Sequence, residues 1–306
     1  MQASQALRHG AVVQPVASGR RAARRGSWLA LFLRQRMAPP AVLILLLVLL
    51  SAALANFVAP SNPERQDYAH VLEPPGGAHL LGTDDLGRDV LSRVIYGSRT
   101  SVSVGLVAVG ISILIGVPLG LTAAYRRGWL DDVIMRLMDA VSAFPALVLA
   151  MGITAALHPG LANVMVAIGV IYIPQFARLA RGQALSVREQ EFVSAARLLG
   201  AGPTRLIARH IWPNVTAPII VQASLLIAAA IVTEASLSFL GAGVPPPTPT
   251  WGGMLQASYQ YTETAPWLAL VPGVAIFLTV LATNIFGDAL RSTLDPRLRT
   301  SSANVK

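Results

Sequence analysis

Two carboxylates lie inside, or close to the ends of, long apolar runs in this 306-residue sequence, where a proton relay would need ionisable groups. Asp139 lies near the start of one run and Glu234 near the end of another. A carboxylate at the centre of a bilayer costs about 2.5 to 3.5 kcal/mol to insert, so it needs a partner, water or a neutral form. Near the end of a span, helix tilt and water relieve that cost. We therefore favour a structural or pathway-lining role for both residues, and proton coupling through Glu234 stays open as the alternative.

A second group of ionisable residues follows a proline-rich stretch, in the sequence LGTDDLGRDVLSR. Thr83 or Asp84 can cap a helix, and Asp89 and Arg93 have the i,i+4 spacing of an ion pair on one helical face. Apolar residues gather on the other face, which is typical of a helix at a membrane surface. The acids lack the alternating ligands and closing glutamate of a calcium loop. We expect an amphipathic surface helix without a metal, in which the polar residues are Asp84, Arg88, Asp89 and Arg93.

The patterns that mark common enzyme chemistries are absent from the sequence. There is no cysteine, which excludes disulfides, thiolate catalysis and cysteine-ligated metals. There is no phosphate-binding loop of the form GxxxxGK[ST], and neither HExxH nor GxSxG occurs. We therefore expect a chain that is not itself an enzyme and that binds no cofactor or metal of its own.

The composition is that of an integral membrane protein. Hydrophobic residues make up 54% of the chain and charged residues 13%, with a mean hydropathy of +0.57. Six windows can cross a hydrocarbon core of about 30 Å: residues 38–58, 102–124, 134–157, 161–179, 215–240 and 267–289. A cleaved signal peptide ending near residues 53–55 is disfavoured, because the first run is long enough to span and five more follow. We expect an all-α membrane protein with six transmembrane helices.

The basic residues are distributed unevenly between these windows. The windows are joined by loops that lie alternately on the two sides of the membrane. Of the 24 lysines and arginines, all but four belong to the termini and loops of one side. The other side has only Arg65, Arg88, Arg93 and Arg99. Because loops rich in positive charge stay in the cytoplasm, we expect both termini and residues 186–214 on that side of a bacterial cytoplasmic membrane. The net charge of +9 thus reflects topology. The arginines are scattered and lack stacking aromatics between them, which argues against nucleic-acid binding.

The polar stretch SVREQEFVSAARLLGAGPTRLIARHIWPN, residues 186–214, separates two apolar windows. Ser186 and Glu189 have the spacing of a capping box, which predicts a helix of about 13 residues. Gly200 suits a left-handed helix end, and Pro203 suits the first turn of a second helix. The first helix has a narrow apolar stripe made of Phe192, Ala195, Ala196 and Leu199. We expect a bent helix pair whose alanines permit close approach to another protein surface, surrounded by a polar rim.

At these residues the chain resembles the permease subunits of binding-protein-dependent ABC importers. Their cytoplasmic motif is Glu-Ala-Ala, three residues, Gly, nine residues, an apolar position, any residue, then Leu-Pro. Ala195, Ala196, Gly200 and Pro213 match this motif, whereas serine, histidine and tryptophan replace its glutamate, apolar position and leucine. The resemblance implies that the segment docks on an ATPase through Phe192, Ser194, Ala195, Ala196, Gly200, His210 and Pro213.

Three further stretches resemble the peptide-importer branch, specifically the second of its two homologous permeases: LGTDDLGRDVLSRVIYGSRTS, EASLSFLGAGVPPPTPTWGGML and GDALRSTLDPRLR. The resemblance covers about residues 28–300. It implies a heterodimer with a second, homologous permease, two cytoplasmic ATPase subunits that hold ATP and Mg²⁺, and an extracytoplasmic solute-binding protein. It implies di- and oligopeptides as solutes, with glutathione, nickel chelates and opines as the alternatives.

We divide the chain into a basic cytoplasmic segment (1–37), a first helix with an extracytoplasmic linker and amphipathic helix (38–100), a permease domain (101–290) and a cytoplasmic tail (291–306). A proton-coupled secondary carrier using Glu234 and a membrane sensor or scaffold are the alternative classes. Such carriers often have repeated halves, and these six windows show no convincing repeat. A sensor would need a signalling domain, and none is attached. The favoured interpretation is a permease subunit that couples ATP hydrolysis by its partners to transport.

Overall fold

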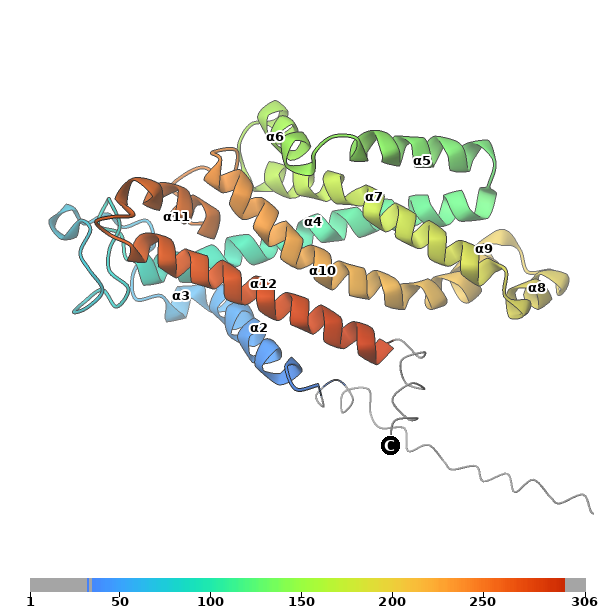
Figure 1. The fold of residues 1–306 in the computed structure, drawn as a ribbon, viewed down its shortest axis with the longest axis horizontal. Coiled ribbons are helices and arrows are strands. Elements are labelled where there is room, and N and C mark those ends of the chain that lie inside the picture. The colour runs from blue at the N-terminus through green and yellow to red at the C-terminus, as the bar shows by residue number, and fades with distance from the viewer. Residues whose placement is uncertain (1–31, 33–34, 295–306) are drawn as a thin grey trace, which may run out of the picture.

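The computed structural model describes residue 32 and residues 35–294, which form an elongated bundle of helices (Figure 1). Within this part of the chain, β-pairing is limited to two isolated bridges, Gly76 with His79 and Thr83 with Asp89. Most of the expected basic segment and of the expected tail lies outside the described residues. The all-helical class predicted from hydropathy is confirmed.

Most connections between the helices are short, and the longest is the loop between α3 and α4, residues 59–89. The helices are α2 (Ala38–Ala53), α3 (Ala55–Val58), α4 (Val90–Arg126), α5 (Trp129–Ser142), α6 (Ala146–Leu157), α7 (Leu161–Arg188), α8 (Glu191–Leu198), α9 (Pro203–Leu206), α10 (Trp212–Phe239), α11 (Trp251–Ser258) and α12 (Trp267–Leu294). A π-helical turn, Ile207–Ile211, joins α9 to α10, and 3₁₀ turns cover Tyr68–His70 and Tyr259–Tyr261.

The six predicted windows correspond to helices of three kinds. Four helical stretches are long and apolar enough to cross a membrane: α4, α7, the continuous run from α9 through α10, and α12. The helices α5 and α6 form a pair that is bent by 90° and can count as a fifth span. The first window holds α2, an apolar helix of 16 residues, followed by the single turn α3. The described residues therefore contain four to five candidate spans and one shorter apolar helix.

The window over residues 134–157 is interrupted at Pro145, a residue whose type allows a kink within a span. Helix α5 ends at Ser142, and α6 begins only at Ala146, after Pro145. Proline cannot donate a backbone hydrogen bond, and it pushes the preceding residue, Phe144, away from helical geometry. A proline near the middle of an apolar window therefore breaks this helix, although hydropathy averaged over the window stays high.

Close packing of α4 on α7 forms the centre of the bundle. Gly116 and Gly120 are one turn apart on α4, and a Cβ at either would lie 2.6 or 2.2 Å from the carbonyl oxygen of Ile173 or Ala177, respectively. Small residues at this spacing let two helix backbones approach closely within a membrane. The hydroxyl of Ser112 also donates to the carbonyl of Gly169 at 2.7 Å. This seam gives the bundle a rigid centre between its two ends.

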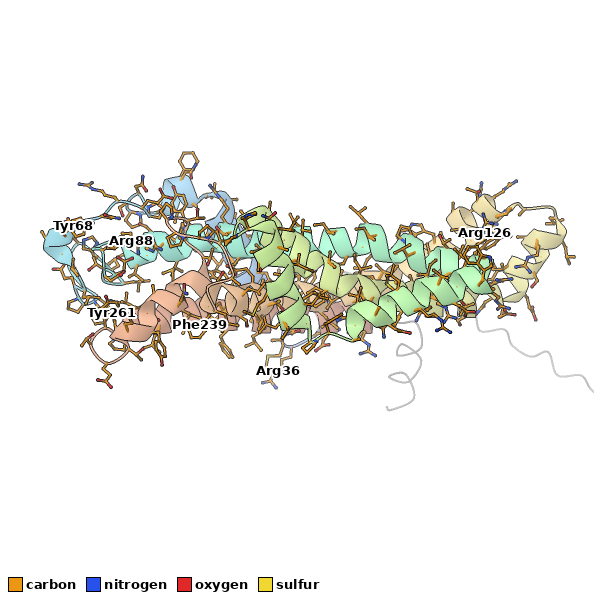
Figure 2. All side chains as sticks on the ribbon, turned by 90° about the horizontal axis from the view of Figure 1, so that it is seen from above. Arg36, Tyr68, Arg88, Arg126, Phe239 and Tyr261 are labelled. Atoms are coloured by element: carbon orange, nitrogen blue, oxygen red, sulfur yellow. The ribbon has the colours of Figure 1, made fainter. Side chains whose placement is uncertain are left out.

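The two loop regions singled out in the sequence lie at opposite ends of the bundle. Figure 2 shows Arg126 at the end that carries α8 and α9, and Tyr68, Arg88 and Tyr261 at the other end. At the first end, the Arg181 guanidinium donates to both carboxylate oxygens of Asp131 at 2.6 and 2.7 Å, which fastens α5 to α7. The 186–214 segment and the 59–89 loop are therefore separated by the length of the bundle.

Candidate functional site

The 186–214 segment begins later than its sequence predicts. Ser186 lies inside α7, and α8 starts at Glu191 with Gln190 as an N-cap that makes no side-chain capping bond. The capping box and the helix of about 13 residues are therefore wrong, because Glu189 has another partner: its carboxylate accepts from Arg127 at 2.8 Å. Arg188 extends the same attachment, since it donates to the carbonyls at the end of α4, at 3.0 and 3.1 Å.

The bend of this segment matches the prediction at Gly200. This residue has φ +82, the left-handed conformation that glycine adopts without strain. Its N–H donates to the carbonyl of Arg197 at 3.0 Å, and the N–H of Ala201 donates to that of Ala196 at 3.1 Å. These two bonds form a Schellman motif, which ends α8 and turns the chain. Pro203 then occupies the first turn of α9, as its fixed φ favours.

The outer face of α8 is apolar and unusually exposed. Leu198 and Leu199 are 90% and 88% exposed, and Phe192 is 44% exposed, whereas Val193 is fully buried. Ala195 is exposed and Ala196 half-buried, so the predicted stripe faces outward. Val193 anchors α8 to the bundle, and sequence reasoning missed it because it lies beside the stripe. Exposed leucines next to small residues form a surface suited to burial against another protein.

The second half of the segment joins α8 to α10. The rings of Phe192 and His210 lie 6.4 Å apart, centroid to centroid. His210 belongs to the π-helical turn, which precedes Pro213 in the first turn of α10. Because proline lacks an N–H, the regular hydrogen-bond ladder cannot continue through it, and a π-turn is one way to accommodate the gap. Ser194 lies on the exposed side of α8, where the importer motif has glutamate.

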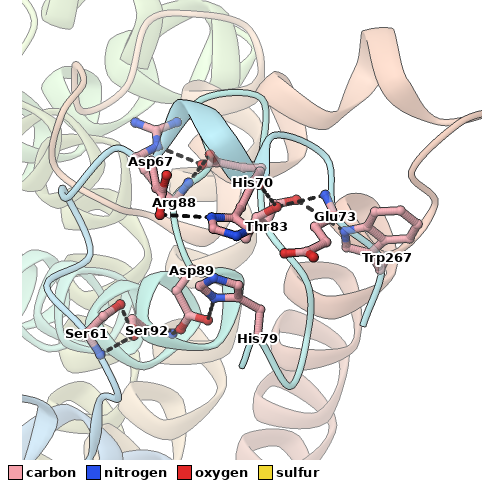
Figure 3. Close-up of polar contacts among 11 residues, drawn as sticks. Ser61, Asp67, His70, Glu73, His79, Thr83, Arg88, Asp89, Ser92 and Trp267 are labelled. Carbon is pink, nitrogen blue, oxygen red and sulfur yellow. Dashed lines mark hydrogen bonds and ion pairs between the residues drawn. The ribbon is translucent and has the colours of Figure 1, made fainter. Parts of the chain in front are cut away.

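At the opposite end, residues 83–93 form a compact cluster rather than a surface helix. Residues 83–89 make turns, and α4 begins at Val90 and continues into the bundle. The prediction of a separate amphipathic helix is therefore wrong. Asp89 caps α4 by accepting from the N–H and hydroxyl of Ser92 at 2.8 and 2.7 Å, and His79 contacts it at 3.0 Å (Figure 3). Because the Asp89 carboxylate caps the first turn of α4, it does not pair with Arg93, the residue at i+4.

The carboxylate that pairs with Arg93 in this cluster is Asp84, where Asp89 was expected. One of its oxygens accepts from Arg88 Nε at 2.7 Å and lies 3.4 Å from Arg93 Nε. All three side chains are nearly buried. Arg93 also donates to the carbonyl of Pro63 at 3.0 Å. The predicted Asp89–Arg93 pair is thus replaced by a buried carboxylate shared between two arginines, and no group of ionisable side chains in the described residues has the arrangement of a metal site.

Nearby, His70 and Asp67 form an exposed pair. The Asp67 carboxylate raises the pKa of the His70 imidazole, first through a 3.0 Å hydrogen bond and then through its charge, and the pKa of Asp67 is lowered in return. Both side chains are close to half exposed, so water screens the pair and limits its effect on stability. Thr83 connects the loop to α12, because its carbonyl accepts from the Trp267 indole at 3.3 Å.

The two carboxylates of the apolar windows have different surroundings. Asp139 is 69% exposed on α5, 3.9 Å from Arg178. Glu234 is fully buried, and it accepts from the hydroxyls of Ser101 on α4 and Ser238 on α10 at 3.1 and 2.8 Å. Thr250, the N-cap of α11, is a further hydrogen-bonding neighbour of Glu234. Glu234 therefore joins three helices, and none of its partners could be identified from sequence spacing except Ser238, one turn away.

Comparison with known proteins identifies relatives over most of the chain. Residues 116–300 match the family model described as "Binding-protein-dependent transport system inner membrane component". The di/tripeptide transport system permease protein DppC of Pseudomonas aeruginosa is 45% identical over 267 residues, which cover 85% of this chain and 88% of that protein. The glutathione transport system permease protein GsiD of Pectobacterium atrosepticum is 44% identical over 270 residues, covering 88% and 90%.

Solved structures share the fold at lower identity. A chain of the MetNI methionine ABC transporter in an inward-facing conformation superposes with a TM-score of 0.56 at 18% identity, covering 66% of this chain and 96% of that one. At this identity the likeness concerns the fold alone. The family match and the relatives show that the chain belongs to the family of binding-protein-dependent transport system inner membrane components.

Proposed function

We propose that this chain is one of two homologous permease subunits of an ATP-driven importer and that it forms part of the translocation pathway for di- and oligopeptides. Two cytoplasmic ATPase subunits hold ATP and Mg²⁺, and an extracytoplasmic binding protein delivers the solute. The chain itself contributes neither catalysis nor a cofactor. The substrate class follows the relatives named for di/tripeptide and glutathione transport.

The observation that carries this proposal is the exposed apolar face of α8 beside the Gly200 turn. Leu198 and Leu199 would be costly to leave in water, because each exposes nearly its whole side chain. A partner that covers them contacts a helix pair fixed at both ends, by Arg188 to α4 and by the π-turn to α10. Movement of that partner would then shift α7 and α10 together, as in a rigid-body transition.

The proposal includes a topology and a location. The 186–214 segment and both termini face the cytoplasm, and the 59–89 loop faces outward, in a bacterial cytoplasmic membrane. Arg126, Arg127 and Arg188 lie at the α8 end of the bundle, which agrees with the usual excess of positive charge on the cytoplasmic side. The proton-coupled carrier is disfavoured, since Glu234 is enclosed by hydroxyl partners and the relatives belong to a family of transport-system components.

Uptake in a reconstituted system tests the function. The chain is co-expressed with a homologous permease, ATPase subunits and a binding protein from the same genome, and the complex is placed in proteoliposomes. We expect ATP-dependent uptake of tri-alanine that requires the loaded binding protein, with glutathione as the competing solute. Uptake that proceeds without ATP and follows a proton gradient would contradict the proposal. Uptake of glutathione but not of tri-alanine would keep the importer and correct its solute.

A further inference from the structure

Uncharged amide side chains follow the seam between α7 and α10 in the half of the bundle that leads to α8. Gln175 and Gln183 lie eight residues apart on one face of α7, and Asn214 and Gln222 lie eight residues apart on one face of α10. The two helices lie side by side (Figure 1), and Gln222 donates to the side-chain oxygen of Gln175 at 3.4 Å. The four amides therefore belong to one surface.

Most of the hydrogen-bonding capacity of these amides is unused. A side-chain amide offers two donor hydrogens and two acceptor lone pairs. The Gln175–Gln222 bond uses one donor and one lone pair, and Asn214 donates once, to the carbonyl of His210 at 2.7 Å. Within residues 35–294, Gln183 makes no side-chain hydrogen bond. Gln175 and Asn214 are exposed, and Gln183 and Gln222 are half-buried.

Lipid is an unfavourable neighbour for this surface, because hydrocarbon offers no partner for an amide. A cavity of about 800 Å³ lies here, lined among others by Gln183, Asn214 and Gln222, with Ser186 at its edge and Arg291 from α12. This volume is within the range of sites that hold small ligands. The surface is thus a hollow in which three amides lie among apolar residues, and it reaches the 186–214 segment at Ser186, Pro213 and Asn214.

We propose, resting on the import function above, that this hollow is the inner part of the translocation pathway. Gln183 and Gln222, which line it, and Gln175, which is hydrogen-bonded to Gln222, bind the main chain of a passing peptide. A peptide main chain presents both N–H donors and C=O acceptors, and each of these side chains pairs with either. Among the described lining residues only Arg291 is charged, so any preference of the walls for the charge of a peptide side chain comes from that residue and not from the amides. Neutral hydrogen bonds are weak enough individually for the solute to leave.

Transport by a double variant tests this assignment. Gln175→Leu with Gln222→Leu keeps side-chain size and removes the amides. In proteoliposomes with all partner subunits, we expect uptake of tri-alanine, Ala-Lys-Ala and Ala-Glu-Ala to fall by a similar factor, about tenfold, as the loss of two neutral hydrogen bonds implies. Gln256→Leu, the same change on α11 at the other end, is the control and should transport like the parent.

Cysteine accessibility tests the pathway separately from the solute. The chain has no cysteine of its own. Cysteines at positions 183 and 222 of the assembled transporter should react with a charged methanethiosulfonate reagent and be protected by tri-alanine during turnover. A cysteine at Phe277, an exposed apolar position of α12, should not react. Unreactive cysteines at 183 and 222, or parental uptake by the double leucine variant, would overturn the inference while the import function stands. A parent complex that transports none of the three peptides would contradict the proposed function. It would also contradict the assignment of these amides to peptide binding, whether or not the cysteines at 183 and 222 react.

Discussion

The ring of Phe192 on α8 lies 6.4 Å from the ring of His210 in the π-turn that leads into α10. This contact connects the two halves of a bent segment whose outer face is exposed leucine and alanine. The inner face is buried through Val193, and Leu206 and Ile211 are buried on the other half. The two halves of the segment therefore contact each other, as the proposed transmission of movement from α8 to α10 requires.

Topology is tested by single cysteines at the two ends. Ser194 is exposed on α8, and Ala257 is exposed on α11 at the opposite end of the bundle. In cells, we expect a membrane-impermeant maleimide to label position 257 from outside and position 194 only after the inner face is opened. The absence of native cysteine removes background from this chain. Labelling of both positions from the same side would refute the arrangement.

The Glu234 junction predicts a graded response to substitution. Glu234→Gln keeps oxygen and nitrogen atoms near Ser101 and Ser238, so the helices should stay joined and ATP-driven uptake should fall only modestly. Glu234→Ala removes the acceptor of two buried hydroxyls, which costs about 1 to 3 kcal/mol for each group left unpaired. We expect a clearly lower unfolding temperature in detergent for the alanine variant and a small change for glutamine.

A protonophore separates this role from proton coupling. If Glu234 only joins α4, α10 and α11, uptake by the parent should persist in a protonophore as long as ATP is maintained. A relay carboxylate cannot be replaced by glutamine without loss of transport. Uptake abolished by Glu234→Gln and by the protonophore at constant ATP would support the carrier and count against the importer.

The shared carboxylate of Asp84 predicts a large loss of stability at the other end. Asp84→Ala leaves Arg88 and Arg93, each with 8% of its side chain exposed, without their common partner. Removing one partner of a buried ion pair costs about 3 to 5 kcal/mol. Asp85→Ala is the matched control, since Asp85 is 29% exposed and lies 3.6 Å from Arg88, so its loss should cost about 1 kcal/mol or less. The comparison uses unfolding temperatures in detergent, and equal shifts would contradict the assignment.

The parts of this fold that depend on local sequence could be predicted, and the parts that depend on distant partners could not. Gly200 and Pro203 specify their own backbone geometry, so the bend was predictable. The capping box failed because Glu189 is bonded to Arg127, a residue from another loop. The Asp89–Arg93 pair failed for the same reason, since Asp84 reaches Arg93 across a turn. The break before α6 follows from Pro145, a local signal, whereas the 90° angle between α5 and α6 depends on packing that the sequence does not show.

The most direct test of coupling compares two glycines that are two residues apart. A side chain at Gly200 would meet open space but a left-handed backbone, which costs a residue with a Cβ about 1 to 2 kcal/mol. Gly202 also has open space around it and an ordinary φ of −70. Gly200→Asp and Gly202→Asp therefore place the same charge nearby, and only the first strains the turn that positions α8.

The measurement is ATP hydrolysis by the reconstituted complex, with and without loaded binding protein, beside pull-down of the ATPase and uptake. With Gly200→Asp we expect the chain to be present in the membrane at the parental level, while the ATPase is lost from the complex or its stimulation by the binding protein disappears, together with uptake. With Gly202→Asp we expect more ATPase in the complex, more stimulation by the binding protein and more uptake than with Gly200→Asp. Parental assembly, stimulation and uptake by Gly200→Asp would contradict the claim that the 186–214 segment couples an ATPase to this bundle.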